Sequence, residues 1–180
     1  MYNICMQAID QNVLQFFVNH RIEWLSFVAL TITYAGGYMI AGGVAVLSAI
    51  SFYIHNHTRR ILPLFIAIVG SSATTYILKH LIERARPIYQ LYFEDGFSFP
   101  SGHATTAMAL YGFLILVIWQ HTESNKKTKY LSIFFLSLLV ILIGVSRLYL
   151  GVHHLSDILV GYLVGFIWLS ISLAILKPKS

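Results

Sequence analysis

Hydrophobic residues along the chain fall into five long runs that contain no Asp, Glu, Lys or Arg. With its flanking residues, each run approaches the roughly 20 residues that an α-helix needs to cross about 30 Å of hydrocarbon. Lipid offers no partners to backbone polar groups, and the runs are too long for barrel strands, so the pattern predicts transmembrane helices. The runs are residues 37–54, 61–78, 104–120, 130–146 and 158–176.

The N-terminal part differs because polar side chains interrupt its apolar pattern. Asp10, His20, Arg21 and Glu23 lie within residues 8–34, and the uncharged stretch that follows Glu23 is too short to span a membrane upright. We interpret residues 8–34 as an amphipathic helix in the membrane interface, with a sixth, distorted span as the alternative.

The predicted fold class is therefore all-α, a polytopic membrane helix bundle of five clear spans plus this N-terminal helix. No repeat, low-complexity tract or linker divides the chain, so residues 1–180 are expected to form a single domain. Gly161 and Gly165 form a small-xxx-small pair in the last run, which favours close packing against another helix.

Composition strengthens the membrane interpretation. The chain is 57% hydrophobic and 11% charged, whereas a soluble domain has about 25% charged residues. The net charge of +5 does not indicate nucleic acid, because many of the basic residues lie in clusters between apolar runs. The single cysteine, Cys5, excludes a disulfide within the chain.

The connections between the runs sort onto two sides of the membrane by parity. Residues 55–60, 121–129 and 177–180 share one side, which the positive-inside rule makes cytoplasmic. Residues 79–103 and 147–157 share the other side, which is the periplasm or the cell exterior. The cytoplasmic assignment depends on seven basic residues, namely Arg59, Arg60, Lys126, Lys127, Lys129, Lys177 and Lys179.

Three polar clusters gather on the non-cytoplasmic side. In the first, "KHLIERARP", Lys79 and Arg86 are seven residues apart and would share a face if the helix continued. In the second, "FSFPSGHA", Ser101 can cap a helix that Gly102 and His103 begin. Such a helix start offers free N–H groups and a positive dipole end to an anion. Taken singly, these clusters could equally be snorkelling cations and a simple cap.

The third cluster, "SRLYLGVHHLSD", places two histidines before an aspartate. If a helix begins near Gly151, His153 and Asp157 are one turn apart on one face. The carboxylate would then hold the imidazole in one tautomer, as in a catalytic triad. His154 would face apolar surroundings or a neighbouring helix, and Arg147 supplies a planar fork for phosphate oxygens.

Together the three clusters favour phosphoryl transfer. Lys79, Arg86 and Arg147 can neutralise phosphate oxygens, and Ser101 and the Gly102 N–H can add hydrogen bonds. His153 can attack phosphorus and His103 can protonate the leaving oxygen. We expect neither a metal nor a cofactor, because Glu94 and Asp95 are adjacent in a loop without acidic partners nearby in sequence.

The same residues give the sequence a close resemblance to the type 2 phosphatidic acid phosphatase family of membrane lipid phosphatases. The family signature K-x6-RP, PSGH and SR-x5-H-x3-D is matched in full over residues 60–176. The resemblance implies phosphate removal from a lipid phosphate or diphosphate through a phosphohistidine on His153, oriented by Asp157, with His103 as the general acid. It implies a bacterial cytoplasmic membrane and substrates such as undecaprenyl diphosphate, phosphatidylglycerophosphate or phosphatidate.

Other functions stay open at this point. A phosphohistidine can pass its phosphate to another lipid, so a lipid phosphotransferase or a lipid A phosphatase of the same family is the alternative. Vanadium haloperoxidases share the motifs, but a chain so deeply embedded in the membrane argues against that activity. A non-catalytic transporter or scaffold with an anion site is the remaining class. The expected partners are a lipid phosphate substrate and membrane lipids, and the oligomeric state is unknown.

Overall fold

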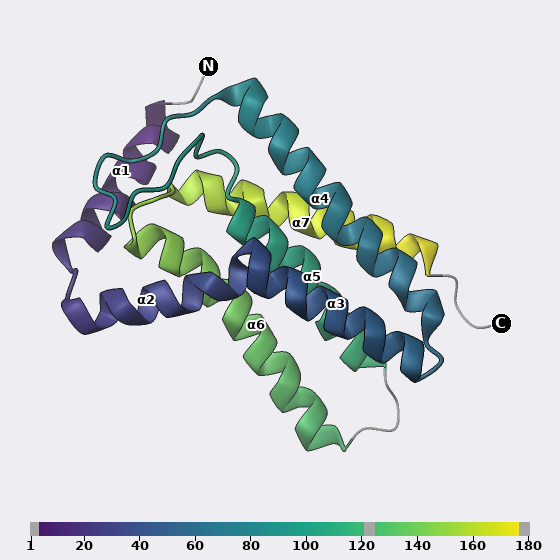
Figure 1. Ribbon diagram of the computed structural model, residues 1–180. Helices are drawn as coiled ribbons and strands as arrows, with labels where there is room; N and C mark the ends of the chain where they lie inside the picture. The colour runs from purple at the N-terminus through teal and green to yellow at the C-terminus, as the bar shows by residue number, and fades with distance from the viewer. Residues whose placement is uncertain (1–3, 121–124, 177–180) are drawn as a thin grey trace.

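The computed structural model describes residues 4–120 and 125–176, and within these residues it is helical, with no β-strand (Figure 1). A short 3-10 turn, Thr58–Arg60, precedes the fourth helix. The α-helices are α1 Ile4–Asn19, α2 Glu23–Gly36, α3 Tyr38–Ile54, α4 Ile61–Ile82, α5 Gly102–Gln120, α6 Lys126–Tyr149 and α7 Leu155–Ile175.

Four of the predicted spans are confirmed as helices long and apolar enough to cross a membrane, namely α4, α5, α6 and α7. The expected first span corresponds to α3, which meets these requirements only together with α2. The two helices are bent by 46° at their junction. Gly36 belongs at this bend because a Cβ there would lie 2.6 Å from the Ile143 side chain of α6.

The N-terminal region is two helices, so the expectation of one amphipathic helix over residues 8–34 is wrong. The break falls at residues 20–22, where Ile22 has an extended backbone. Arg21 turns inward there, and its guanidinium donates to the carbonyl oxygens of Tyr149 at 3.1 Å and Tyr89 at 2.7 Å. Two of the polar residues that suggested an interfacial face, Asp10 and Arg21, therefore make internal contacts, whereas His20 and Glu23 are exposed.

Helix α5 forms the centre of the bundle and packs against α4, α6 and α7 (Figure 1). Small residues allow α7 to approach it closely. A Cβ on Gly161 would lie 2.7 Å from the Ser101 carbonyl oxygen, and one on Gly165 would lie 2.6 Å from that of Thr105. The close packing predicted from the glycine pair is therefore present, and it joins the start of α7 to the start of α5.

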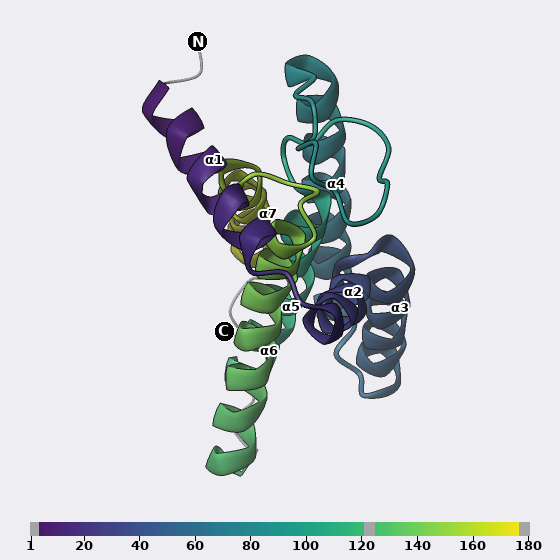
Figure 2. The same ribbon diagram turned by 90° about the vertical axis from the view of Figure 1, so that its left-hand side faces the viewer.

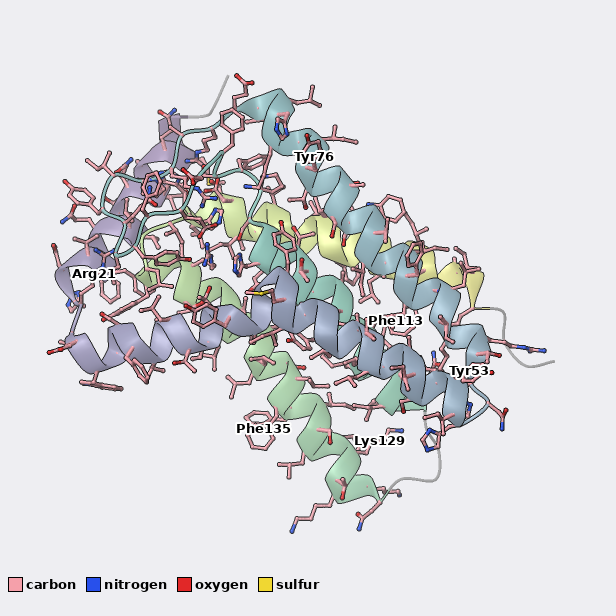
Figure 3. All side chains as sticks on the ribbon, in the orientation of Figure 1. Arg21, Tyr53, Tyr76, Phe113, Lys129 and Phe135 are labelled. Atoms are coloured by element: carbon pink, nitrogen blue, oxygen red, sulfur yellow. The ribbon has the colours of Figure 1, made fainter. Side chains whose placement is uncertain are left out.

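Large apolar side chains cover the outside of the bundle. Phe113 is completely buried in the core, whereas Phe135 on α6 is 57% exposed and projects outward, as do Tyr53 and Tyr76 (Figure 3). A water-soluble protein rarely exposes continuous apolar surface of this kind. Lipid is the solvent that this exterior fits.

The connections collect at two opposite ends (Figures 1 and 2). Residues 83–101 and the α6–α7 turn lie together at one end, beside α1. The α3–α4 connection and the start of α6 lie at the other end, and they carry Arg59, Arg60 and the lysines of the first turn of α6. Lys177 and Lys179, which were assigned to the same side by parity, fall outside the described residues.

Candidate active site

A cavity of about 300 Å³ opens at the end that holds residues 83–101. Five of the eight predicted site residues line it: Lys79, Arg86, Gly102, His103 and His153. The other three, Ser101, Arg147 and Asp157, are buried behind its walls. The remaining lining residues are Tyr38, His80, Glu94, Asp95, Gly96 and Phe97.

Lys79 and Arg86 meet in this cavity, but not as neighbours on a continuous helix. Helix α4 ends at Ile82, and Glu83 adopts a left-handed backbone with φ of 48°, so the expectation of one helix through Arg86 is wrong. Arg86 instead lies in the loop, where its guanidinium donates to the carbonyl oxygens of Val152 at 3.0 Å and Gly96 at 3.1 Å. Lys79 donates to the Phe97 carbonyl oxygen.

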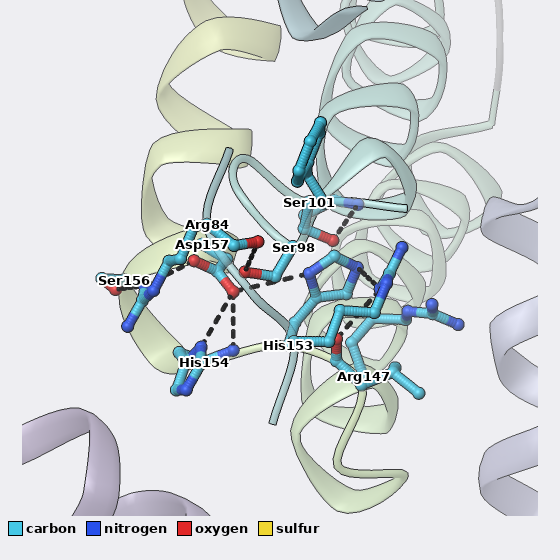
Figure 4. A network of polar contacts seen from close by, with 12 residues as sticks. Arg84, Ser98, Ser101, Arg147, His153, His154, Ser156 and Asp157 are labelled. Carbon is cyan, nitrogen blue, oxygen red and sulfur yellow. Dashed lines mark hydrogen bonds and ion pairs between the residues drawn. The ribbon is translucent and has the colours of Figure 1, made fainter. Parts of the chain in front are cut away.

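His153 precedes α7, which begins at Leu155 and not near Gly151 as expected. Arg86 Nη1 lies 3.3 Å from His153 Nε2. Because arginine can only donate, Nε2 carries the lone pair and the ring proton belongs on Nδ1. Nδ1 faces Asp157 Oδ2 at 3.6 Å, which is too long for a hydrogen bond (Figure 4). In catalytic sites such pairs are often too far apart before substrate binds and approach to hydrogen-bond distance afterwards.

The environment of His153 keeps its imidazole neutral. The ring is almost fully buried. Burial lowers the pKa of His153 to about 4, against the opposing influence of Asp157, and the charges of Arg147 and Arg86 lower it further. The unprotonated Nε2 therefore faces a cationic cavity at neutral pH, which is the state that a nucleophile requires.

His154 also contacts Asp157, which the expectation of apolar surroundings or a neighbouring helix did not include. It is the N-cap of α7, and its backbone N–H donates to Asp157 Oδ2 at 2.8 Å. Its ring Nδ1 lies 3.4 Å from the same oxygen (Figure 4). Both histidine rings are thus close to Asp157, but of the two only His153 lines the cavity.

Ser101 connects the beginnings of two helices. Its hydroxyl oxygen is 3.5 Å from the Ala104 N–H, a weak cap of α5, and its own N–H donates to the Asp157 carbonyl oxygen at 2.9 Å. Gly102 lies close to Tyr38, since a Cβ there would be 3.0 Å from the Tyr38 hydroxyl. His103 follows in the first turn of α5 and faces the cavity.

Arg147 lies fully buried on α6, and its partners come from distant segments. Nη1 donates to Thr33 Oγ1 at 2.8 Å and to the Tyr92 hydroxyl at 2.6 Å, while Nη2 pairs with Glu94. Glu94 also pairs with Arg86 at 3.0 Å. The sequence showed no acidic partner near Glu94, and the charged partners that tertiary folding brings to it are two arginines.

Glu94 therefore places a carboxylate between two arginines that were predicted to bind phosphate. Burial opposes ionisation of Glu94, but the charges of Arg147 and Arg86 outweigh it and lower the pKa of Glu94 to about 2. A phosphate group entering this cavity meets cations that already have an anionic partner.

Glu94→Gln is expected to tighten the binding of orthophosphate and vanadate by roughly tenfold, equivalent to about 1.4 kcal/mol. The neutral amide no longer competes as an anion for Arg86 and Arg147. Inhibition constants measured for both oxyanions check this result, with Asp95→Asn as a matched control in the same loop. Weaker oxyanion binding in Glu94→Gln would show instead that Glu94 holds the arginines in their binding positions.

A further polar network, which the sequence did not suggest, lies behind Asp157. Arg84 donates to Asp157 Oδ1 at 2.6 Å and to Asp10 Oδ2 at 2.8 Å (Figure 4 shows the Arg84 and Asp157 side chains). Asp10 comes from α1 and also contacts Ser156. The available signal in the sequence was Asp10 itself, because a lone carboxylate in an apolar helix costs free energy unless it has a partner.

Comparisons with known proteins identify the family of the chain. Residues 60–179 match the PAP2 superfamily. The chain is 29% identical to phosphatidylglycerophosphatase B of Bacillus subtilis (strain 168) over 163 residues, which cover 90% of this chain and 80% of that protein.

Two crystal structures are similar along almost the whole chain. One is a transmembrane PAP2-type phosphatidylglycerolphosphate phosphatase from Bacillus subtilis, with a TM-score of 0.88 and 27% identity, covering 96% of this chain and 87% of that one. The other is LpxE of Aquifex aeolicus, with a TM-score of 0.72 and 26% identity, covering 92% and 94%. The family match, the helical fold and the shared motifs agree, and the chain therefore belongs to the PAP2 superfamily as a multi-pass membrane phosphatase.

Proposed function

We propose that this protein removes phosphate from a lipid phosphate or diphosphate at the non-cytoplasmic leaflet through a phosphohistidine intermediate on His153. The main support is the direction of His153 Nε2, which carries its lone pair into a cavity also lined by Lys79, Arg86 and His103. Asp157 orients the imidazole from the opposite side. Arg147, Ser101 and Gly102 complete the phosphate-binding set.

In the first step, His153 Nε2 attacks phosphorus, and the bond from phosphorus to the lipid oxygen breaks. His103 gives its proton to that leaving oxygen. Water then attacks phosphorus with His103 accepting a proton, the nitrogen–phosphorus bond breaks, and orthophosphate leaves. Lys79, Arg86 and Arg147 stabilise the equatorial oxygens in both steps.

A lipid is the favoured substrate because apolar surface surrounds the phosphate cavity. Tyr38 lines the cavity and is 70% exposed, and Phe93, next to Glu94, is 82% exposed. The relatives named for phosphatidylglycerophosphate make that lipid a leading candidate. Undecaprenyl diphosphate and phosphatidate present the same terminal phosphate chemistry.

A lipid phosphotransferase or lipid A phosphatase is the second candidate, and the similarity to LpxE fits it. The two reactions differ only in what attacks the phosphohistidine. Water produces orthophosphate, whereas a lipid hydroxyl or phosphate produces a phosphorylated lipid.

The deciding experiment measures orthophosphate release by detergent-purified protein from four lipids: phosphatidylglycerophosphate, undecaprenyl diphosphate, phosphatidate and lipid A. Release from at least one of them supports the hydrolase. A phosphorylated acceptor lipid without free phosphate would support the transferase. A folded protein that produces neither would contradict both and favour a non-catalytic anion site.

Activity is expected to survive EDTA and to be inhibited by vanadate. The predicted groups that stabilise phosphate are side-chain cations and hydrogen-bond donors, and no three His, Cys, Asp or Glu side chains in residues 4–120 and 125–176 are placed to hold a metal ion. Vanadate can mimic pentacoordinate phosphorus against these groups. Loss of activity in EDTA that magnesium restores would contradict the mechanism.

The proposed orientation in a bacterial cytoplasmic membrane follows from charge. Arg59, Arg60 and the lysines that begin α6 lie at the end opposite the cavity, and short cytoplasmic connections are enriched in Lys and Arg. The basic residues at the cavity end are largely engaged in the site. The cavity would then face the periplasm or the cell exterior.

Single-cysteine labelling in intact cells tests this orientation after Cys5 has been replaced by serine. A cysteine at Asp95, exposed beside the cavity, is expected to react with a membrane-impermeant maleimide. A cysteine at Thr128, exposed in the first turn of α6, is expected to react only after lysis. The opposite pattern would place the cavity in the cytoplasm. Ser124, in the connection before α6, would be another position for this cysteine, but it lies outside the described residues.

A further inference from the structure

Asp10 is a buried carboxylate that comes from the first helix and reaches the start of the last one. It is 1% exposed. Its Oδ1 accepts from the Ser156 backbone N–H at 2.9 Å, and its Oδ2 accepts from the Ser156 hydroxyl at 2.6 Å. Oδ2 also accepts from Arg84 at 2.8 Å. Burying a charge costs several kcal/mol unless such partners compensate it. These contacts therefore fix the position of the Asp10 carboxylate.

Arg84 connects Asp10 to the predicted catalytic pair. One arm of its guanidinium, Nη2, contacts Asp10, while the other, Nη1, donates to Asp157 Oδ1 at 2.6 Å and to the Ser156 hydroxyl at 2.7 Å. The planar fork of arginine fixes the angle between its two arms. The position of Asp10 therefore determines how the guanidinium meets Asp157.

The two oxygens of Asp157 are divided between two tasks. Oδ1 is held by Arg84, while Oδ2 accepts the His154 N–H at 2.8 Å and faces His153 Nδ1. Asp10 also balances the charge of Arg84. Because one guanidinium is shared by two carboxylates, the three side chains together carry a net negative charge beside the His153 imidazole. If a neutral side chain replaced Asp10, the positive charge of Arg84 would no longer be shared between Asp10 and Asp157.

We propose that Asp10 is a positioning residue of the enzyme: through Arg84 it sets the orientation of the Asp157 carboxylate that faces His153. This role rests on the proposed function of His153 as the nucleophile. It gives α1, which lies outside residues 60–179 matched to the family, a part in the chemistry.

Asp10→Asn is the direct test because the amide keeps the shape of the side chain. An amide oxygen can still accept the Ser156 N–H, but the amide nitrogen donates and cannot accept from Arg84. We expect kcat to fall about 10- to 100-fold, the range found when an outer hydrogen-bond partner of a metal ligand is removed. KM should change less than about threefold, since no substrate contact is lost.

Leu14→Ala is the matched control for a role confined to holding α1 in place. Leu14 lies one turn further along α1 and is buried, and it belongs to neither polar network. We expect it to lower the melting temperature but to leave kcat per folded enzyme close to wild type. Equal losses of kcat in Leu14→Ala and Asp10→Asn would overturn the positioning role.

A double-variant cycle with Arg84→Gln tests the route through Arg84. If Asp10 acts through Arg84, adding Asp10→Asn to Arg84→Gln should cause little further loss of kcat. If the kcat losses of the two single variants multiply in the double variant, the proposal is overturned. An Asp10→Asn enzyme with wild-type kcat would also overturn it. A wild-type protein without phosphatase activity is a different result, since it contradicts the proposed function itself.

If Asp10→Asn does not fold, Ser156→Ala carries the test, because it removes the hydroxyl that contacts both Asp10 and Arg84 while Asp10 stays paired with Arg84 and with the Ser156 backbone N–H. We expect kcat of Ser156→Ala to fall about threefold to tenfold, equivalent to one ordinary hydrogen bond, with KM unchanged. Wild-type kcat in Ser156→Ala would then overturn the positioning role.

Discussion

Replacement of His153 by alanine is expected to reduce lipid phosphate turnover by roughly 10³-fold or more, because an enzyme without its nucleophile retains only binding and charge stabilisation. The imidazole lines the cavity, its Nε2 lies beside Arg86, and its pKa of about 4 keeps it unprotonated at neutral pH. The measurement is kcat for orthophosphate release by folded, detergent-purified protein.

His154→Ala is the matched control at the neighbouring position. The hydrogen bond from His154 to Asp157 at 2.8 Å uses the backbone N–H and survives the substitution. We therefore expect His154→Ala to keep activity within about tenfold of wild type, the loss of one modest side-chain contact. Similar large losses in two well-folded variants would contradict the assignment of His153 as nucleophile.

Asp157→Asn is expected to lower kcat strongly, towards the roughly 10⁴-fold loss that the same change causes in the serine protease triad. Arg84 donates to Oδ1, so the asparagine oxygen would turn towards Arg84 and its NH₂ group towards His153. An amide donor facing Nδ1 favours the tautomer with its proton on Nε2, which removes the attacking lone pair. The same NH₂ group would also meet the His154 N–H.

The measurement for Asp157→Asn combines kcat with the melting temperature, because the variant also loses a buried ion pair with Arg84. The rate loss should persist at temperatures where the variant is fully folded. Near-normal kcat in folded Asp157→Asn would show that His153 does not depend on this carboxylate.

The hydrocarbon environment explains why most of the fold could be predicted from the sequence. A span must satisfy its own backbone hydrogen bonds, so an uncharged run of sufficient length indicates a helix without knowledge of its neighbours. Helices α4 to α7 follow this rule. The bent pair α2 and α3 does not, and the close approach of Gly36 at its bend to Ile143 of α6 is a tertiary feature that spacing within one helix does not reveal.

The sequence by itself determined that the residues of the three motifs gather at one end of the bundle, because parity of the spans brings the motifs there. Their spacing also indicated Asp157 as the partner of His153. Only the tertiary structure decided which nitrogen of His153 faces the cavity, since Arg86 reaches it from a loop and not along α4. It likewise placed Glu94 between two arginines and joined Asp10 to Arg84. These contacts link segments far apart in the chain, and helical spacing predicts only neighbours within one helix.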